Sequence, residues 1–121
     1  MRNNVIAEKS YAFALDVIKL TLELRRNNHH YELSSQLMRS GTSIGANIAE
    51  AEYAQSKKDF IAKMYIALKE ANETVYWIRL LKDSEIIDYE KARNMYERVS
   101  EIRRILIAII KTSKCNSEKR D

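Results

Sequence analysis

The side chains that could do chemistry are few, and they form no recognisable catalytic or metal-binding pattern. His29 and His30 are adjacent, so their side chains point in different directions on a helix, and we interpret them as exposed loop residues. Glu50, Glu70 and Glu73 could supply carboxylates to a dinuclear metal site in a helical bundle. Such a site also needs a Glu-x-x-His motif on each of two helices, and no histidine follows a glutamate at that spacing. We therefore expect no metal and no cofactor.

Nucleophilic catalysis and nucleotide binding also lack their usual signals. Cys115 is the single cysteine and lies in a polar C-terminal segment, and no serine is accompanied by a histidine on a plausible scaffold. Neither of the common glycine-rich phosphate-binding motifs is present. We therefore expect a protein that is not an enzyme. The single cysteine, the absence of a signal peptide and the absence of a long apolar stretch predict a soluble cytoplasmic protein.

The composition predicts helices. The chain has 121 residues, of which 45% are hydrophobic and 31% charged, which is enough for one domain with its own core. Proline is absent and glycine occurs only twice, so the usual signals of hairpins and long loops are missing. The net charge of +4 is mildly basic and is compatible with binding a polyanion without requiring it.

Apolar periodicity divides the chain into four helices, predicted at about residues 5–26, 35–53, 57–82 and 89–113. Short loops between them favour an all-α, antiparallel up-down-up-down four-helix bundle that forms a single domain over residues 1–113. Residues 114–121 have no apolar periodicity, and we expect them to form a mobile polar tail. Ser34 or Ser35 could cap the second helix, Ser56 with Asp59 resembles a capping box at the third, and Asp88 could cap the fourth.

The first helix carries two adjacent apolar rows, which make a stripe wider than a two-helix seam needs. One row consists of Phe13, Val17, Leu20 and Leu24, and the other of Tyr11, Leu15, Ile18 and Leu22. This width predicts that the helix touches more than one neighbour.

The second helix contains both glycines, Gly41 and Gly45, which would let another backbone approach closely. We favour a continuous helix over a local break near Gly41, because the apolar spacing keeps its phase across the glycines. A polar series runs along the same helix: Arg39, Ser43, Asn47 and Glu50. It predicts either a hydrogen-bonded network with Glu70 and Glu73 on the third helix or a surface for recognition and assembly.

Some apolar residues have no obvious place inside one bundle. The fourth helix ends in the sequence ILIAII, which is apolar on every side and should be buried on every side. Trp77 lies outside the apolar rows of the third helix, and aromatic residues are enriched in interfaces. We therefore predict contacts between subunits at Trp77, Ile105, Ile107 and Ile110.

Two segments, SSQLMRSGTSIGANIAEA and SKKDFIAKMYIALKEANETVYWIRLL, closely resemble the four-helix-bundle proteins encoded within intervening sequences of 23S ribosomal RNA genes. The similarity runs from about Tyr11 to Ile87. The family's Ser-Ile-x-x-Asn-Ile-x-Glu element falls on Ser43, Ile44, Asn47, Ile48 and Glu50, and its later serine, aromatic, alanine and glutamate fall on Ser56, Phe60, Ala67 and Glu70. Ala51-Glu52 departs from the Glu-Gly that closes the second helix in many members.

The resemblance implies a homopentamer of antiparallel four-helix bundles with no established catalytic activity. The related accessory variability protein of diversity-generating retroelements, a basic pentamer, binds nucleic acid and a reverse transcriptase. Our first hypothesis is therefore a non-enzymatic oligomeric scaffold that contacts RNA or DNA without sequence specificity. The candidate phosphate contacts are Arg25, Arg26, Lys57, Lys58, Arg103, Arg104, Lys111 and Lys114. The alternative is a protein–protein adaptor, which an exposed apolar groove around Trp77 or Tyr76 would favour.

Overall fold

In the computed structural model the chain forms four α-helices and the turns between them. The model describes the backbone of residues 4–28 and 30–120, and the side chains of 5–27 and 30–116. The helices are α1 (Asn4–Asn28), α2 (Tyr31–Ala51), α3 (Lys57–Asp83) and α4 (Tyr89–Arg120). No strand occurs in the described part of the chain, so the prediction of an all-α protein with four helices is confirmed.

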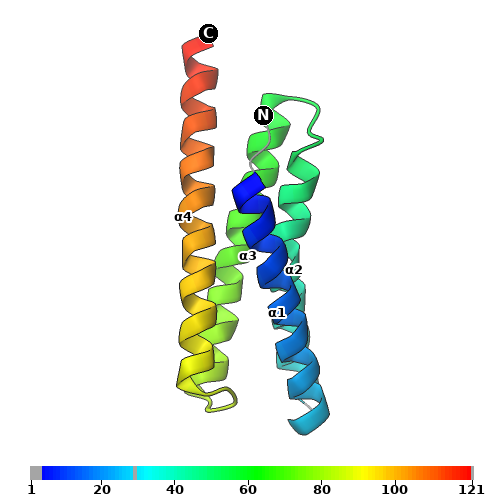
Figure 1. Ribbon diagram of the computed structural model, residues 1–121. Coiled ribbons are helices and arrows are strands. Elements are labelled where there is room, and N and C mark those ends of the chain that lie inside the picture. Colours follow the sequence, from blue (N-terminus) through cyan, green and yellow to red (C-terminus); the bar gives the residue numbers. More distant parts are fainter. Residues whose placement is uncertain (1–3, 29, 121) are drawn as a thin grey trace.

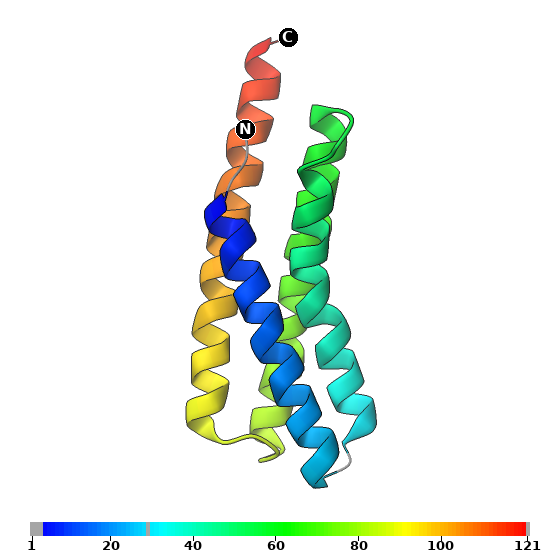
Figure 2. The ribbon, with the colours of Figure 1, turned by 45° about the vertical axis from the view of Figure 1, so that its right-hand side comes forward.

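Consecutive helices run in opposite directions and lie side by side (Figures 1 and 2). Contacts are extensive between α1 and α2, between α2 and α3, and between α3 and α4. The α1–α4 pair has far fewer, although it closes the bundle. None of the described helices is both long and apolar enough to cross a membrane.

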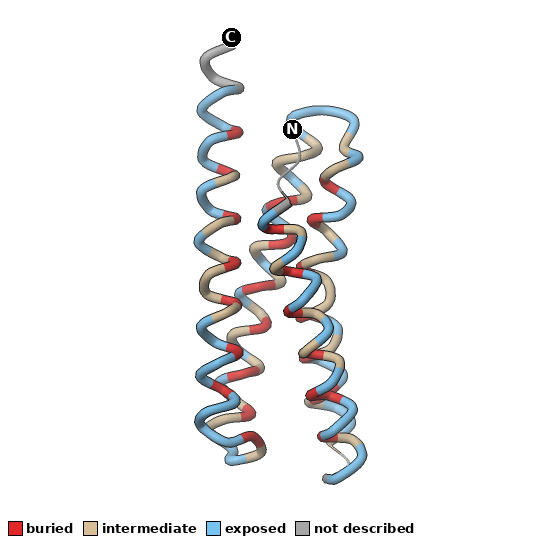
Figure 3. The backbone as a smooth tube through the Cα atoms, in the orientation of Figure 1, coloured by how far each residue is buried: buried red, intermediate tan, exposed pale blue. Residues whose placement is uncertain are grey.

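The core lies along the sides of the helices that face one another (Figure 3). Phe13, Val17, Leu20 and Leu24, the first predicted row of α1, are all buried. Residues at alternating spacings of three and four are also buried on α3 and on α4. They are Met64, Ala67, Ala71, Thr74, Ile78 and Leu81 on α3, and Ala92, Met95, Val99, Ile102 and Leu106 on α4. The remaining large buried side chains come mainly from α2: Leu37, Ile44 and Ile48.

Two of the three predicted N-terminal caps are present in the structure. The Ser56 hydroxyl accepts a hydrogen bond from the Asp59 N–H at 3.0 Å, and the Asp88 carboxylate accepts one from the Lys91 N–H at 2.7 Å. The predicted serine cap of α2 is wrong. That helix begins at Tyr31, and Ser34 is buried inside its first turns, where its hydroxyl donates to the Tyr31 carbonyl at 3.1 Å. A serine hydroxyl can donate to a carbonyl inside a helix as well as cap a helix N-terminus. A serine in the sequence therefore does not by itself locate the start of a helix.

Helix α2 is continuous across both glycines, as the phase of its apolar residues predicted. The reason for Gly41 is the closeness of α1. A Cβ at Gly41 would lie 2.8 Å from Cγ2 and 2.9 Å from Cγ1 of Val17, closer than carbon atoms normally pack. At Gly45 the same atom would lie 3.4 Å from the Ser10 hydroxyl, which is an ordinary contact. Gly41 therefore sets how closely α1 and α2 approach.

The C-terminal end of α4 differs from the prediction. The helix continues to Arg120, so the segment 114–120 is helical and not a tail without regular structure. Polar residues without apolar periodicity can extend an existing helix, because adding residues to a helix avoids the unfavourable nucleation step. As a result, α4 extends well beyond the start of α1 (Figure 2).

Candidate interaction surfaces

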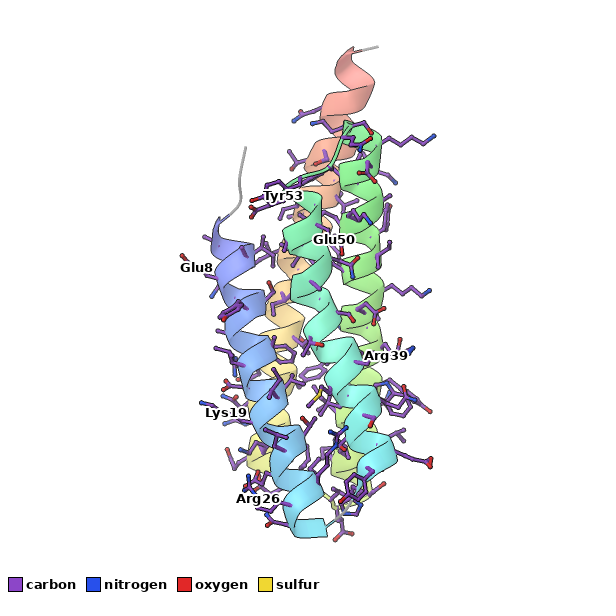
Figure 4. All side chains as sticks on the ribbon, turned by 90° about the vertical axis from the view of Figure 1, so that its right-hand side faces the viewer. Glu8, Lys19, Arg26, Arg39, Glu50 and Tyr53 are labelled. Carbon is purple, nitrogen blue, oxygen red and sulfur yellow. The ribbon has the colours of Figure 1, made fainter. Side chains whose placement is uncertain are left out.

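The polar series of α2 and the two glutamates of α3 lie along the α2–α3 seam. Figure 4 shows Arg39 and Glu50 on α2, and the electrostatic influence of Arg39 on Glu70 places the two near each other. Two of the four α2 residues bond within their own helix: the Ser43 hydroxyl donates to the Arg39 carbonyl at 2.6 Å, and the Asn47 amide to the Ser43 carbonyl at 2.8 Å.

The network predicted between the two sets does not form directly. Glu50 is instead bonded to Lys63 of α3, with 3.0 Å between Nζ and Oε1. A buried bond links the helices deeper in the seam, where the hydroxyls of Thr74 and Ser40 lie 3.0 Å apart. Sequence reasoning missed Lys63 and Ser40, although Ser40 lies in phase with the buried Leu37 and Ile44.

Charged side chains of both signs lie along the α2–α3 seam and shift the pKa values of Glu70 and Lys63. Burial and repulsion by Glu73 raise the pKa of Glu70, and they outweigh the attraction of Arg39 and Lys69. Glu73 also accepts a hydrogen bond from the Trp77 indole at 3.4 Å. On the same seam, the hydrogen bond to Glu50 and its negative charge raise the pKa of Lys63. The arrangement fits a structural link between helices better than proton-transfer chemistry.

The eight basic residues proposed for nucleic-acid contact do not gather on one face. Three are already engaged or partly covered by the protein itself. Arg25 donates to the hydroxyls of Ser34 and Ser35 at 2.9 and 2.7 Å, while the Lys114 ammonium donates to the Tyr65 hydroxyl at 2.7 Å. Arg103 is half-buried. The other five are exposed, with Arg26 near the lower end of the molecule in Figure 4 and the rest on α3 and α4: Lys57, Lys58, Arg104 and Lys111.

The second apolar row of α1 lies on its solvent side. Tyr11 is 67% exposed and Leu22 47%, Leu15 is also exposed, and Ile18 is half-buried. Spacings of four and three residues place these four side chains on one side of the helix. We call them the α1 face. The width of the apolar stripe therefore reflects an uncovered surface in addition to the contacts of α1 with α2 and α4.

A second exposed apolar surface lies over the α3–α4 seam, and we call it the α3–α4 face. It comprises Tyr65 and Tyr76 of α3 with Tyr96 and Ile107 of α4, all exposed. The bond from Lys114 to Tyr65 shows that this side of α4 adjoins α3. Two buried polar atoms on the same part of α4, Ser100 Oγ and Arg103 Nε, have no hydrogen-bond partner.

A groove of about 1040 Å³ lies where α4 passes the start of α1 and the α2–α3 turn. Its apolar floor comes from all four helices: Ile6, Ile48, Phe60, Met64, Ile105 and Ile109. We call it the upper groove. Lys57 and Arg104 lie at its rim with Glu52 and Glu101.

The four residues predicted to contact other subunits have different surroundings. Ile107 is 44% exposed on the α3–α4 face, while Ile105 lines the upper groove. Trp77 is half-buried, and its ring packs edge-on against Tyr76 with 5.1 Å between centroids. Ile110 is only 4% exposed, so it belongs to the core of the monomer. The predicted contact at Ile110 is wrong because other residues of the same chain already cover this side chain. The sequence ILIAII does not show which of its residues the chain itself covers.

The described residues contain no group of three or more histidine, cysteine or acidic side chains arranged to hold a metal ion. His30 directly precedes α2 and is partly exposed, while His29 lies outside the described residues. Cys115 is exposed on α4.

Comparison with known proteins gives a consistent assignment. The family model for the 23S rRNA-intervening sequence protein matches residues 2–108. A crystal structure of a protein of unknown function from the S23 ribosomal protein family of Bacteroides thetaiotaomicron is 48% identical to the chain. It superposes with a TM-score of 0.87 and covers 88% of this chain and 98% of its own. No curated protein shows significant sequence similarity to the chain.

Proposed function

The chain belongs to the 23S rRNA-intervening sequence protein family, and we propose that it is a non-enzymatic scaffold, an antiparallel four-helix bundle that assembles into a ring-shaped homopentamer. The observation that carries this proposal is the pair of exposed apolar surfaces, the α1 face and the α3–α4 face. The number of subunits comes from the family resemblance. The exposed Cys115 fits a reducing cytoplasmic location.

The positions of the two faces favour a ring over a twofold dimer. Helix α1 contacts α2 and α4, and α3 contacts the same two helices, so α1 and α3 lie on opposite sides of the bundle. When one face of a subunit packs on a different face of the next, the contact is heterologous, and it gives a ring when the rotation between neighbouring subunits closes.

The test is the mass in solution, measured by light scattering on a size-exclusion column. Leu15→Glu places a charge on the α1 face and Ile107→Asp on the α3–α4 face, so each variant should give smaller species. Ala12→Glu is the control, because Ala12 is exposed on α1 outside the apolar row. Mixing the two monomeric variants should give a one-to-one complex, because each retains the face that the other lacks. A wild-type monomer, or an oligomer unaffected by both substitutions, would refute the assembly.

We further propose that the ring contacts RNA or DNA through phosphate groups, using exposed basic residues such as Lys57, Lys58 and Lys111. A ring repeats these weak contacts in every subunit, so their combined affinity exceeds that of one chain. Binding to a short mixed-sequence RNA duplex should weaken steeply as salt rises and should depend little on sequence. Binding that salt does not affect, or no binding at low salt, would favour the adaptor function.

A further inference from the structure

A second groove, of about 530 Å³, lies between α1 and the lower half of α4, and we call it the lower groove. The eight basic residues predicted from the sequence do not gather on one face, but basic residues do gather here. Four of them line the lower groove: Lys19, Arg26, Lys91 and Arg98. Only Arg26 was among the eight, so tertiary structure brings together a set of cations that sequence reasoning did not find.

The four cations form one row on each side of the lower groove. Lys19 and Arg26 are seven residues apart on α1, and Lys91 and Arg98 are seven apart on α4. Seven residues are about two helical turns, so each pair shares one side of its helix, with about 10 Å between its members. Figure 4 shows Lys19 and Arg26 on the same side of α1. Positive charge therefore flanks the groove from both helices.

Two carboxylates also line the lower groove, and one of them is already neutralised. Asp16 is paired with Arg98, whose guanidinium carbon lies 5.5 Å from the centroid of the Phe13 ring. The remaining charged residues of the groove are exposed and form no ion pair with another described residue: Lys19, Glu23, Arg26 and Lys91. Three of these charges are positive and one is negative, so the groove attracts an anionic ligand.

We propose that the lower groove binds the phosphate backbone of RNA or DNA. The site rests on the nucleic-acid function proposed for the ring, and it places the main contacts between α1 and α4. A strand of a duplex carries one phosphate for about every 3.4 Å of axis, so about three phosphates pass along a groove ~10 Å long. Lys19 and Arg26 contact them from α1 and Lys91 from α4, and the Asn94 amide can donate to a phosphate oxygen.

The experiment measures binding of the full chain to a fluorescein-labelled, mixed-sequence RNA duplex by anisotropy, at several salt concentrations. The double variant Lys19→Glu with Lys91→Glu should bind at least about tenfold more weakly than wild type at low salt. Because two phosphate contacts are lost, the slope of log affinity against log salt should become shallower by about 1.4 to 1.8. Both side chains are exposed, so the circular dichroism spectrum should not change.

A second double variant separates the lower groove from basic charge in general. Lys57→Glu with Lys58→Glu changes the net charge by the same amount at exposed residues outside the groove. It should weaken binding by less than about threefold. If it weakens binding as much as the groove variant does, the nucleic-acid function stands and the lower groove is not its site. If wild type binds no RNA at low salt, the proposed function and this site are both wrong.

A gain in affinity provides a test that a misfolded variant would not pass. Glu23→Gln removes the unpaired carboxylate of the lower groove and should strengthen RNA binding about two- to threefold. Glu32→Gln removes the same charge at an exposed position on α2 and should change nothing. Equal effects of the two substitutions would overturn the site. Displacement of the RNA by polyglutamate as efficiently as by unlabelled RNA would show that the groove binds acidic chains of any kind, and the assignment to phosphate would be wrong.

The lower groove lies beside the α1 face, and Leu22 belongs to both. The cations of the groove come from a single chain, so the site should not require a second subunit. Ile107→Asp, which should reduce the mass, leaves the groove unchanged. Adding Lys19→Glu and Lys91→Glu to Ile107→Asp should therefore weaken RNA binding further. No further loss in that background would overturn a site formed by one chain.

Discussion

Helix α1 meets its two neighbours in different ways. Against α2 it packs so closely that a Cβ atom at Gly41 would clash with the Val17 side chain. Against α4 it is held by two ion pairs, Lys9–Glu101 and Asp16–Arg98. Open grooves of about 1040 and 530 Å³ adjoin these ion pairs along the α1–α4 seam.

The difference indicates where the helices are packed most closely and where they leave open space between them. Exposed ion pairs contribute about 0–1 kcal/mol each, whereas a fully buried aliphatic side chain contributes about 1.5–3 kcal/mol. The α1–α2 seam should therefore be sensitive to single methyl groups, and the α1–α4 seam should tolerate charge changes. The following predictions test this contrast.

The largest effect is expected at the α1–α2 seam. Gly41→Val forces two methyl groups into the space of Val17, and we expect a loss of about 3 kcal/mol in the free energy of unfolding. Urea denaturation followed by circular dichroism measures this loss. Adding Val17→Ala should reduce the penalty, because the two side chains compete for the same volume. If the cost in the Val17→Ala background were the same, the clash would not be its cause.

The second glycine provides the matched comparison. A Cβ at Gly45 meets the Ser10 hydroxyl at 3.4 Å, so Gly45→Ala fits without displacing a neighbour. Alanine is about 1 kcal/mol more favourable than glycine within a helix, and we expect this variant to be more stable by up to that amount. A melting temperature clearly below that of wild type would show that α1 and α2 are closer at Gly45 than the structure indicates.

A smaller effect is expected at the α1–α4 seam. Asp16→Asn removes the ion pair between Asp16 and Arg98. The Asp16 side chain is 43% exposed and the Arg98 side chain 30%. The loss should be less than about 1 kcal/mol and should shrink further at high salt. Urea denaturation at low and high ionic strength measures both quantities. A loss above about 2 kcal/mol that salt does not affect would mean that this seam is as important as the α1–α2 seam.

The smallest effect concerns the α2–α3 seam and depends on pH. Burial and Glu73 raise the pKa of Glu70 above its ordinary 4.5, so the folded protein binds more protons there than the unfolded chain. The stability that Glu70 contributes is therefore fully present below pH 4.5 and is lost as the pH rises through the folded pKa. Glu70→Gln should be more stable than wild type at pH 7 and should lose less stability between acid and neutral pH. Lower stability of this variant at pH 7 would show that attraction to Arg39 outweighs burial.

Local features explain the successful predictions. Helix starts at Ser56 and Asp88 depend on a side chain and a backbone N–H three residues away, so the sequence contains both partners. The buried rows of α1 and α3 follow from helical spacing alone. The end of α4 was placed too early because no sequence signal opposes extension of a polar helix beyond Ser113.

The candidate surfaces were only partly predictable. Helical spacing identified Tyr11, Leu15 and Leu22 as a row but did not show that no other helix covers it. The polar series of α2 was found, yet its cross-helix partners depend on the register of α3 against α2. That register brings Lys63 to Glu50 and Thr74 to Ser40.

The helical segments, the side of each helix that carries the main core row, and the absence of the usual catalytic motifs can all be recognised in the amino-acid sequence. Tertiary structure decided that Ile105 lines a groove, Ile107 lies on an outer face and Ile110 joins the core, although all three come from one apolar run. The physical reason is that periodicity reports which residues share a side of a helix. Which neighbour covers that side depends on the lengths and offsets of the packed helices, and here on a first helix that begins below the end of the last (Figure 2).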